Sequence, residues 1–319
     1  MNDLILALDF GGTKLTAATV ARSEVLSGGR EWLARQRVFS PANADAQFDI
    51  SNIVTLGKQI LKGAAPQSIG VSFGGPANYA TGMIRRSDHV PGWENTPLQR
   101  LLEGEFAAPV RLDNDANVAA LGEQQFGAGK GYQDLLYITV STGVGGGWIL
   151  AGRPWRGRDG MAGEIGHVVV DADGPDCLCG KQGCVERYAS GPYMAQDARQ
   201  WLEQEPQRGA ILRELSREAP LSAKMLAVAV RQGDELAEEI LLRGAWALGV
   251  GIGNTANLMN PSLFVLGGGV TKAGDPWWET VRRVAGETAL NDMVFDIVPA
   301  ALGDDAPLWG AVALALYHR

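Results

Sequence analysis

The chain has 319 residues, which exceeds the usual size of one compact core and favours two domains of roughly 150 residues each. Its 36 acidic residues outnumber its 28 Lys and Arg residues, and the net charge of -8 at pH 7 argues against nucleic-acid binding through a general basic surface. No stretch approaches the roughly 20 apolar residues of a membrane span, and the N-terminal MNDLILALDFGG does not resemble a signal peptide. We therefore expect a small-molecule partner, no nucleic-acid or membrane partner, and a cytoplasmic location.

Two stretches share one layout, in which an apolar run is followed by a glycine turn and a second apolar run. They lie at 4–20 (LILALDFGGTKLTAATV) and at 135–150 (LLYITVSTGVGGGWIL). Each pattern predicts a β-hairpin with a glycine turn. Two similar hairpins indicate two similar domains.

Between the hairpins, strand-like and helix-like patterns alternate. The apolar runs at 69–73 and 109–113 have the length of strands, whereas 46–62 and 97–107 carry apolar residues at helical spacing. A further helix is predicted at 116–126. This alternation predicts the α/β class.

The boundaries of that further helix can also be predicted. We expect Asp115 to cap its N-terminus and Gly127 to end it in a left-handed turn.

The C-terminal third begins with the longest helical pattern of the chain, at 234–259, which ends before Pro261. A strand at 262–266 and a glycine turn at 267–269 follow. Asp304 and Asp305 open a last apolar helix that runs to about 317 and is expected to pack back on the N-terminal domain. The predicted domains are therefore 1–115, joined by the helix at 304–319, and 116–303.

The glycine turns are candidates for phosphate binding, because glycine lets backbone N–H groups approach an anion closely. The first turn comprises Asp9, Gly11, Gly12, Thr13 and Lys14, and its Asp9 stands at a strand end where it can hold hydrated Mg²⁺. A lone glycine loop is more often only a tight turn. Two loops in matching hairpins, and a third glycine run at 267–269, favour a triphosphate site; there is no GxxxxGK[ST] loop.

All three cysteines lie in one loop near a histidine. Cys177, Cys179, Cys184 and His167 supply one imidazole and three sulfurs within 18 residues, the ligand set of a structural zinc site. With four protein ligands no position remains for water, so a catalytic zinc is disfavoured. The alternative is three reduced cysteines beside an unrelated histidine. His89 and His318 are expected at the surface or at the rim of the site.

The sequence resembles the ROK family of bacterial sugar kinases and sugar-responsive repressors, and within it the glucokinases. Six motifs carry this resemblance, in order along nearly the whole chain: LDFGGTK, VSFGGP, LDNDANVAALGE, STGVGGGWI, GEIGH and CLCGKQGCVE. It implies the actin-like ATPase fold, ribonuclease H-like in each of two domains, with a cleft that closes on ATP and sugar. The implied activity is ATP-dependent phosphorylation of a hexose hydroxyl, with glucose expected to give glucose 6-phosphate.

The resemblance also implies roles for particular residues. The first turn and Thr142–Gly143 would hold phosphates, and Gly268 and Gly269 would lie near adenosine. Asn114 and Asp115 match the sugar-binding and catalytic pair, and residues that match Glu164, His167 and Glu186 line the sugar site, with His167 also on zinc. Gly75 is placed at the sugar as well, since an N-acetyl group would need room there. Homologues often form dimers or tetramers, so a homo-oligomer is expected.

Asp115 is the expected catalytic base, because phosphoryl transfer to a hydroxyl needs a carboxylate that accepts the hydroxyl proton. It stands at a strand end that enters a helix, where α/β sheets bind ligands. Its simpler interpretation is a helix N-cap only. Asp113 lies two residues earlier in the chain, out of phase with this position, and it is not the expected base.

Several alternatives remain at this point. The sugar can instead be N-acetylmannosamine, N-acetylglucosamine, fructose or allose, and polyphosphate can replace ATP as the donor. A non-catalytic sugar sensor is opposed by the intact Asp115. A sugar-sensing repressor needs a helix-turn-helix segment, whereas the first phosphate hairpin begins here at residue 4.

Overall fold

The computed structural model of the chain describes residues 3–87 and 90–317. His89 and His318 therefore lie outside the described residues. The chain divides into two compact units: unit 1 comprises 1–133, 147–162 and 301–319, and unit 2 comprises 134–146 and 163–300. None of the helices in the described ranges is long and apolar enough to cross a lipid bilayer.

Unit 1 is built on a five-stranded sheet of order β3-β2-β1-β4-β7. Its strands are β1 Leu4–Phe10, β2 Lys14–Ala21, β3 Ala34–Phe39, β4 Ser68–Phe73 and β7 Val110–Asn114. The predicted first hairpin is present, since β1 and β2 pair antiparallel. Strands β1, β4 and β7 run parallel, and Asp9, Ser72 and Asp113 stand side by side in their register. The carboxyl ends of these strands therefore meet at one edge of the sheet.

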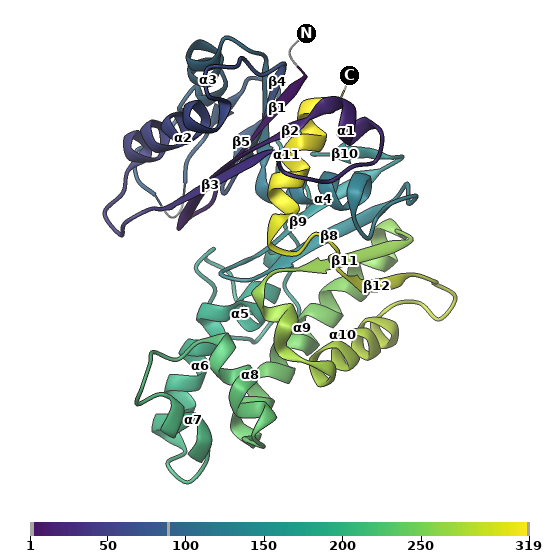
Figure 1. Cartoon of the computed structure of the whole chain (residues 1–319). Coiled ribbons are helices and arrows are strands. Elements are labelled where there is room, and N and C mark those ends of the chain that lie inside the picture. The colour runs from purple at the N-terminus through teal and green to yellow at the C-terminus, as the bar shows by residue number, and fades with distance from the viewer. Residues whose placement is uncertain (1–2, 88–89, 318–319) are drawn as a thin grey trace. The chain divides into compact units, whose positions relative to one another are not determined.

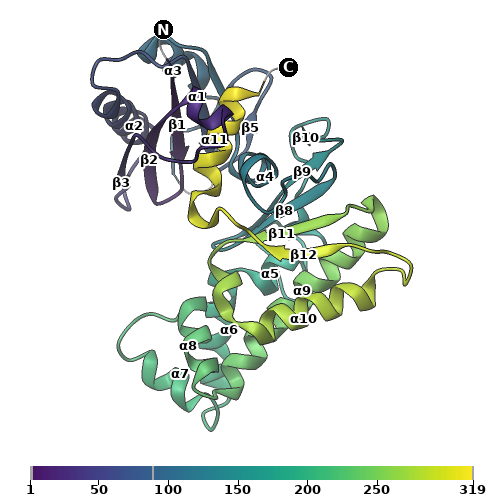
Figure 2. The same cartoon turned by 45° about the vertical axis from the view of Figure 1, so that its right-hand side comes forward.

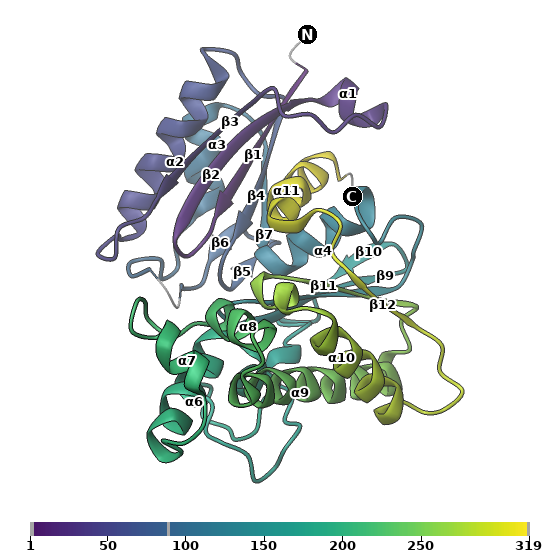
Figure 3. The same ribbon diagram turned by 60° about the horizontal axis from the view of Figure 1, so that its bottom comes forward.

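Helices cover both faces of this sheet (Figure 1). The helices α2 and α3 pack on one face, whereas α11 packs against β1 and β4 on the other, as Figure 3 also shows. A Cβ atom on Gly70 would lie 1.7 Å from the Ala311 carbonyl oxygen, so only glycine lets α11 approach β4 this closely. The helices are α1 Arg22–Leu26, α2 Ala46–Leu61, α3 Leu98–Phe106, α4 Asp115–Phe126 and α11 Ala306–Leu316, with a short β5 Ala77–Asn78 and β6 Met83–Ile84 and the 3-10 turn η3 Gly303–Asp305.

Both predicted ends of helix α4 need correction. The N-cap is Asn114, whose side-chain oxygen accepts hydrogen bonds from Ala116 N and Asn117 N, and Asp115 is already the first helical residue. Gly127 does not adopt a left-handed conformation, because its φ is -117°. Instead, the buried Glu123 carboxylate accepts from Ala128 N at 2.8 Å and so holds the chain after the helix.

The second sheet has the order β10-β9-β8-β11-β12. Its strands are β8 Leu135–Val140, β9 Val144–Leu150, β10 Arg153–Trp155, β11 Leu263–Gly267 and β12 Asp296–Pro299. Strands β8, β11 and β12 belong to unit 2, whereas β9 passes from unit 2 into unit 1 at Gly147. The predicted second glycine turn connects β8 and β9.

Unit 2 carries its helices around the long α9 (Figure 2). As predicted, α9 ends before Pro261, with Asn260 as a left-handed C-cap. Helix α10 runs along α9, and α5, α6 and α8 also pack against α9. The helices are α5 Val185–Ala189, α6 Gly191–Gln204, α7 Ala210–Leu215, α8 Ala223–Arg231, α9 Glu235–Met259 and α10 Asp275–Thr288, with the 3-10 turns η1 Ile165–His167 and η2 Gly269–Ala273.

The compact units differ from the residue ranges predicted for the domains. Helix α4 belongs to unit 1, although it begins at the expected boundary of 115, because it packs against α11. Residues 301–319 also belong to unit 1. The two domains at 1–115 and 116–303 stay a prediction.

Candidate active site

The first glycine turn joins β1 to β2 and exposes its backbone. Gly11 N donates to Lys14 O at 3.0 Å, and Ser40 N donates to Thr13 O at 3.0 Å, so the turn is closed and anchored while Gly12 and Thr13 remain exposed. Asp9 is buried at the end of β1. Burial raises its pKa, an effect that the Ser72 hydroxyl and the positive charge of Lys14 oppose.

Asp115 lies beside this turn in unit 1. A Cβ atom added to Gly74 would lie 3.7 Å from Gly12 N and 3.8 Å from Asp115 Oδ2. The backbone of the glycine turn and the Asp115 carboxylate therefore both lie next to Gly74. Burial raises the pKa of Asp115 to about 6, and the negative charge of Asp9 adds to this rise. A carboxyl group with a pKa near neutrality is suited to accept a proton.

The two oxygens of Asp115 differ in their surroundings. Oδ1 accepts hydrogen bonds from Asn114 Nδ2 at 2.9 Å and from Ala116 N at 2.8 Å. Oδ2 is the oxygen near Gly74. The Asn114 side chain also donates to Gly75 O at 3.2 Å, so three of the predicted sugar-binding residues, Gly75, Asn114 and Asp115, form one hydrogen-bonded group.

The second glycine turn borders a cavity of about 740 Å³ in unit 2. Predicted residues Thr142 and Gly269 line it, and Gly268 stands next to it with a φ of 93°. A Cβ atom on Gly268 would lie 2.3 Å from Val140 O, so the turn after β11 can approach β8 only with glycine. Sequence reasoning missed the cavity's cationic residues, Lys224, Arg231 and Lys272, because helices α8 and η2 carry no local signal for this role.

The predicted sugar-binding residues of unit 2 lie close to the same turn. The Glu186 carboxylate accepts a hydrogen bond from Val144 N at 2.8 Å, and a Cβ atom on Gly143 would lie 2.8 Å from Glu186 Oε2. Glu164 is exposed at the start of η1, which ends at His167. Helix α5 begins directly after Cys184 and carries Glu186 in its first turn.

The four candidate zinc ligands converge in unit 2. One ligand atom from each of His167, Cys177, Cys179 and Cys184 lies within 4.8 Å of all the others. The sulfurs of Cys179 and Cys184 are 3.6 Å apart, close to the spacing of about 3.8 Å that a tetrahedron with Zn–S bonds of about 2.3 Å requires. The buried Nδ1 of His167 has no hydrogen-bond partner among the described residues. These residues therefore fit a zinc ion.

The segment 167–184, which carries the four candidate ligands and is called the metal loop below, is anchored by residues of α5 and α6 that sequence reasoning did not single out. The Tyr193 hydroxyl accepts a hydrogen bond from Leu178 N at 2.8 Å, between two of the cysteines. The Arg187 guanidinium stacks over the Tyr193 ring and forms a buried ion pair with Asp197, with an N–O distance of 2.7 Å. The loop is thus fixed at its centre as well as at its sulfurs.

Comparisons with known proteins identify the family. The model of the ROK family matches residues 5–318, and the chain belongs to this family. A glucokinase of Streptomyces coelicolor is 33% identical, with 98% of this chain and 97% of that protein covered. A xylose repressor of Caldicellulosiruptor bescii is 29% identical over 70% of this chain and 56% of its own length.

A solved relative shows the same fold. The ROK family glucokinase of Streptomyces griseus, solved in complex with glucose and AMPPNP, is 32% identical with a TM-score of 0.82, and 98% of this chain and 99% of that one are covered. The two mixed α/β sheets thus form the two-domain, actin-like fold of the ROK family, and the predicted fold is confirmed.

Proposed function

We propose that this protein is an ATP-dependent kinase that phosphorylates a hexose hydroxyl, with glucose as the substrate and glucose 6-phosphate as the product. The half-buried Asp115 is the observation that carries this proposal. Its carboxyl group has a pKa of about 6, and it lies beside a glycine turn whose backbone is exposed. Relatives named as glucokinases cover nearly the whole chain.

The nucleotide roles follow from the two glycine turns. Asp9, Gly11, Gly12, Thr13 and Lys14 would bind phosphate oxygens and hydrated Mg²⁺, since N–H donors, a cation and a carboxylate are placed there. Thr142 and Gly143 would bind phosphates in unit 2, and Gly268 and Gly269 would lie near adenosine. The cavity that Thr142 and Gly269 share supports this assignment.

The sugar roles are assigned to the residues that the sequence predicted for them. Asp115 Oδ2 would accept the proton of the attacking hydroxyl, while Asn114 and Gly75 orient that hydroxyl. Glu164, His167 and Glu186 would accept or donate hydrogen bonds to the other hydroxyls. No charged side chain other than Asp115 needs to change its protonation state in this scheme.

The zinc site is proposed to be structural. His167, Cys177, Cys179 and Cys184 would hold Zn²⁺ with no open position. Bound zinc supplies a fixed crosslink and no substrate contact. Because His167 and Cys184 adjoin η1 and α5, this crosslink would fix the segments that carry Glu164 and Glu186.

Other members of the same class remain as alternatives. N-acetylmannosamine, N-acetylglucosamine, fructose or allose can replace glucose, and polyphosphate can replace ATP. A repressor function is a second candidate, favoured only by relatives such as the xylose repressor, of which the chain covers 56%. We also propose a homo-oligomer in the cytoplasm, by analogy with the family.

A coupled kinase assay tests the proposal. Purified protein is supplied with ATP or polyphosphate and a panel of hexoses and N-acetylhexosamines, with Asp115→Asn as the matched blank. We expect glucose to be phosphorylated with ATP, and turnover by Asp115→Asn to fall by about 10²–10⁴-fold while sugar binding persists. A flat panel, or equal turnover by the variant, would overturn the proposal.

A further inference from the structure

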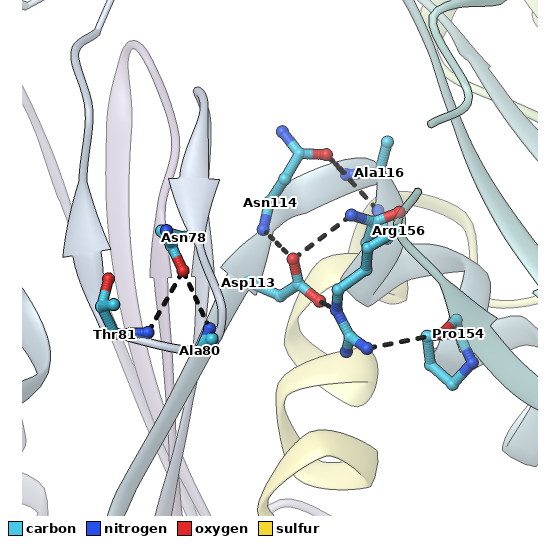
Figure 4. Close-up of polar contacts among 9 residues, drawn as sticks. Asn78, Ala80, Thr81, Asp113, Asn114, Ala116, Pro154 and Arg156 are labelled. Atoms are coloured by element: carbon cyan, nitrogen blue, oxygen red, sulfur yellow. Dashed lines mark hydrogen bonds and ion pairs between the residues drawn. The ribbon is translucent and has the colours of Figure 1, made fainter. Parts of the chain in front are cut away.

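A second carboxylate, Asp113, lies directly before the Asn114–Asp115 pair and is almost fully buried, with 2% exposure. Its Oδ1 accepts from Asn114 N at 2.9 Å and from Asn117 Nδ2 at 3.2 Å. Its Oδ2 accepts from Arg156 Nε, as Figure 4 shows. One carboxylate therefore joins the end of β7, the first turn of α4 and the segment that follows β10.

The Arg156 guanidinium is itself held on several sides. It lies over the Tyr79 ring, 3.7 Å from the ring centroid, and its Nη1 donates to Pro154 O at 3.4 Å. Its side chain is only 18% exposed. Such a planar group, packed on an aromatic face, offers its Nε–H in a defined direction.

The hydrogen bonds that Asp113 accepts call for its ionised form, and the ion pair with Arg156 favours that form. Burial raises the pKa of Asp113, and the neighbouring Arg156 charge opposes that rise. An ionised carboxylate accepts hydrogen bonds at both oxygens, whereas a protonated one turns one oxygen into a donor. Without Arg156, a buried and unpaired charge would remain.

The Asn114 residue transmits this restraint to Asp115. Its backbone N–H is bound by Asp113, and its side chain donates to Asp115 Oδ1 and caps α4. We propose that Asp113 and Arg156 are positioning residues, which fix the Asn114 backbone and thereby aim Asp115 at the sugar hydroxyl. The inference rests on the proposed kinase function, and it adds two residues that act through Asn114.

The test compares Arg156→Met with a matched control on the same hairpin, Arg153→Met. Arg153 is exposed, and the hydrogen-bond partners of Asp113 among the described residues are Asn114, Asn117 and Arg156 instead. We expect Arg156→Met to lower kcat by about 10–100-fold with KM for ATP and sugar changed by less than about threefold, since a small misplacement of a reacting group has this effect. Arg156→Lys should recover part of kcat, and Arg153→Met should behave as the wild type.

A double variant separates positioning from charge compensation. Arg156→Met leaves the Asp113 charge unpaired and can impair folding, whereas Asp113→Asn/Arg156→Met is neutral at this site. We expect the double variant to regain the thermal midpoint but to keep a kcat at least about tenfold below that of the wild type. Full recovery of kcat in the double variant would overturn the proposal.

Amide hydrogen exchange of the peptide at 110–118 gives a readout that does not depend on turnover. We expect faster exchange in Arg156→Met than in Arg153→Met, because the Asn114 amide loses its fixed acceptor. If the wild type phosphorylates no sugar, the proposed function fails, and exchange alone decides whether the pair fixes this segment. Unchanged exchange with a kcat within twofold of the wild type would refute the positioning role.

Discussion

The junction at residues 113–117 and the metal loop at 167–184 both fix polar side chains, but they differ in what holds them. The junction is continuous with the β4–β7 ladder and with helix α4, so backbone and side-chain hydrogen bonds determine its shape. Within the metal loop, regular structure is confined to η1 and to isolated bridges such as Val169 with Cys184. Hydrogen bonds within a strand and a helix hold the junction, whereas the proposed zinc ion would add a crosslink to a loop with little regular structure.

The two regions should therefore respond oppositely when their key side chain is removed. In the junction Asp113 is buried and Asp115 is half-buried, and the negative charge of the nearby Asp9 raises the pKa of Asp115 further. Desolvation of these carboxylates, and repulsion between Asp9 and Asp115, therefore oppose folding. The metal loop brings three thiols together, and in the proposed zinc site an ion would hold them. Three measurements test this contrast.

The largest effect is expected from loss of the metal. Cys184→Ser, or a chelator applied to the wild type, should lower the thermal midpoint by roughly 5–10 °C, because metal binding stabilises only the folded loop. Metal analysis and calorimetry measure this. A chelator should have no further effect on Cys184→Ser, and an unchanged midpoint after complete loss of zinc would contradict the structural role.

The opposite sign is expected for Asp115→Asn. The pKa of Asp115 is raised from 3.8 to about 6 in the folded protein, so its contribution favours folding below pH 3.8 and is lost as the pH rises through 6. At pH 8 the substitution should increase the free energy of unfolding by about 1–3 kcal/mol, and this gain should shrink towards pH 4. Urea unfolding at both pH values measures it.

The exposed Asp159 provides the control for that measurement. Its side chain is 67% exposed, so Asp159→Asn should leave the free energy of unfolding unchanged at either pH. A loss of stability in Asp115→Asn at pH 8 would mean that the ionised carboxylate is better solvated than its burial indicates.

The smallest effect is expected in the pH dependence of the wild type. If Asp115 is the base, kcat/KM should fall about tenfold per pH unit below pH 6, because the carboxylate must be deprotonated to accept a proton. Initial rates between pH 4.5 and 8 measure this limb. If kcat/KM instead falls only near pH 4, the base is a well-solvated carboxylate with an ordinary pKa. The junction would then not be destabilised by its carboxylates, and the contrast with the metal loop would fail.

Local pattern was enough to predict most elements of the chain. Alternating apolar runs and glycine turns predicted both hairpins, and helical spacing together with Pro261 predicted α9 and its end. These features depend on short-range sterics and on periodic burial, which a sequence displays directly. The cluster of His167 and the three cysteines could also be predicted, because all four residues lie within 18 positions of the chain.

What the sequence determined about this protein is therefore its α/β class, its motifs and the chemical types of its site residues. The folded structure decided the rest: that Asn114 and not Asp115 caps α4, and that Gly127 keeps a negative φ while Glu123 holds the following chain. It also brought Arg156 to Asp113, 43 residues away in the chain. The contact between Arg156 and Asp113 depends on how strands and helices pack, so no local pattern encodes it. The hydrogen bonds at the ends of α4 are local, but the sequence offers adjacent residues, Asn114 and Asp115, that are both suitable as caps.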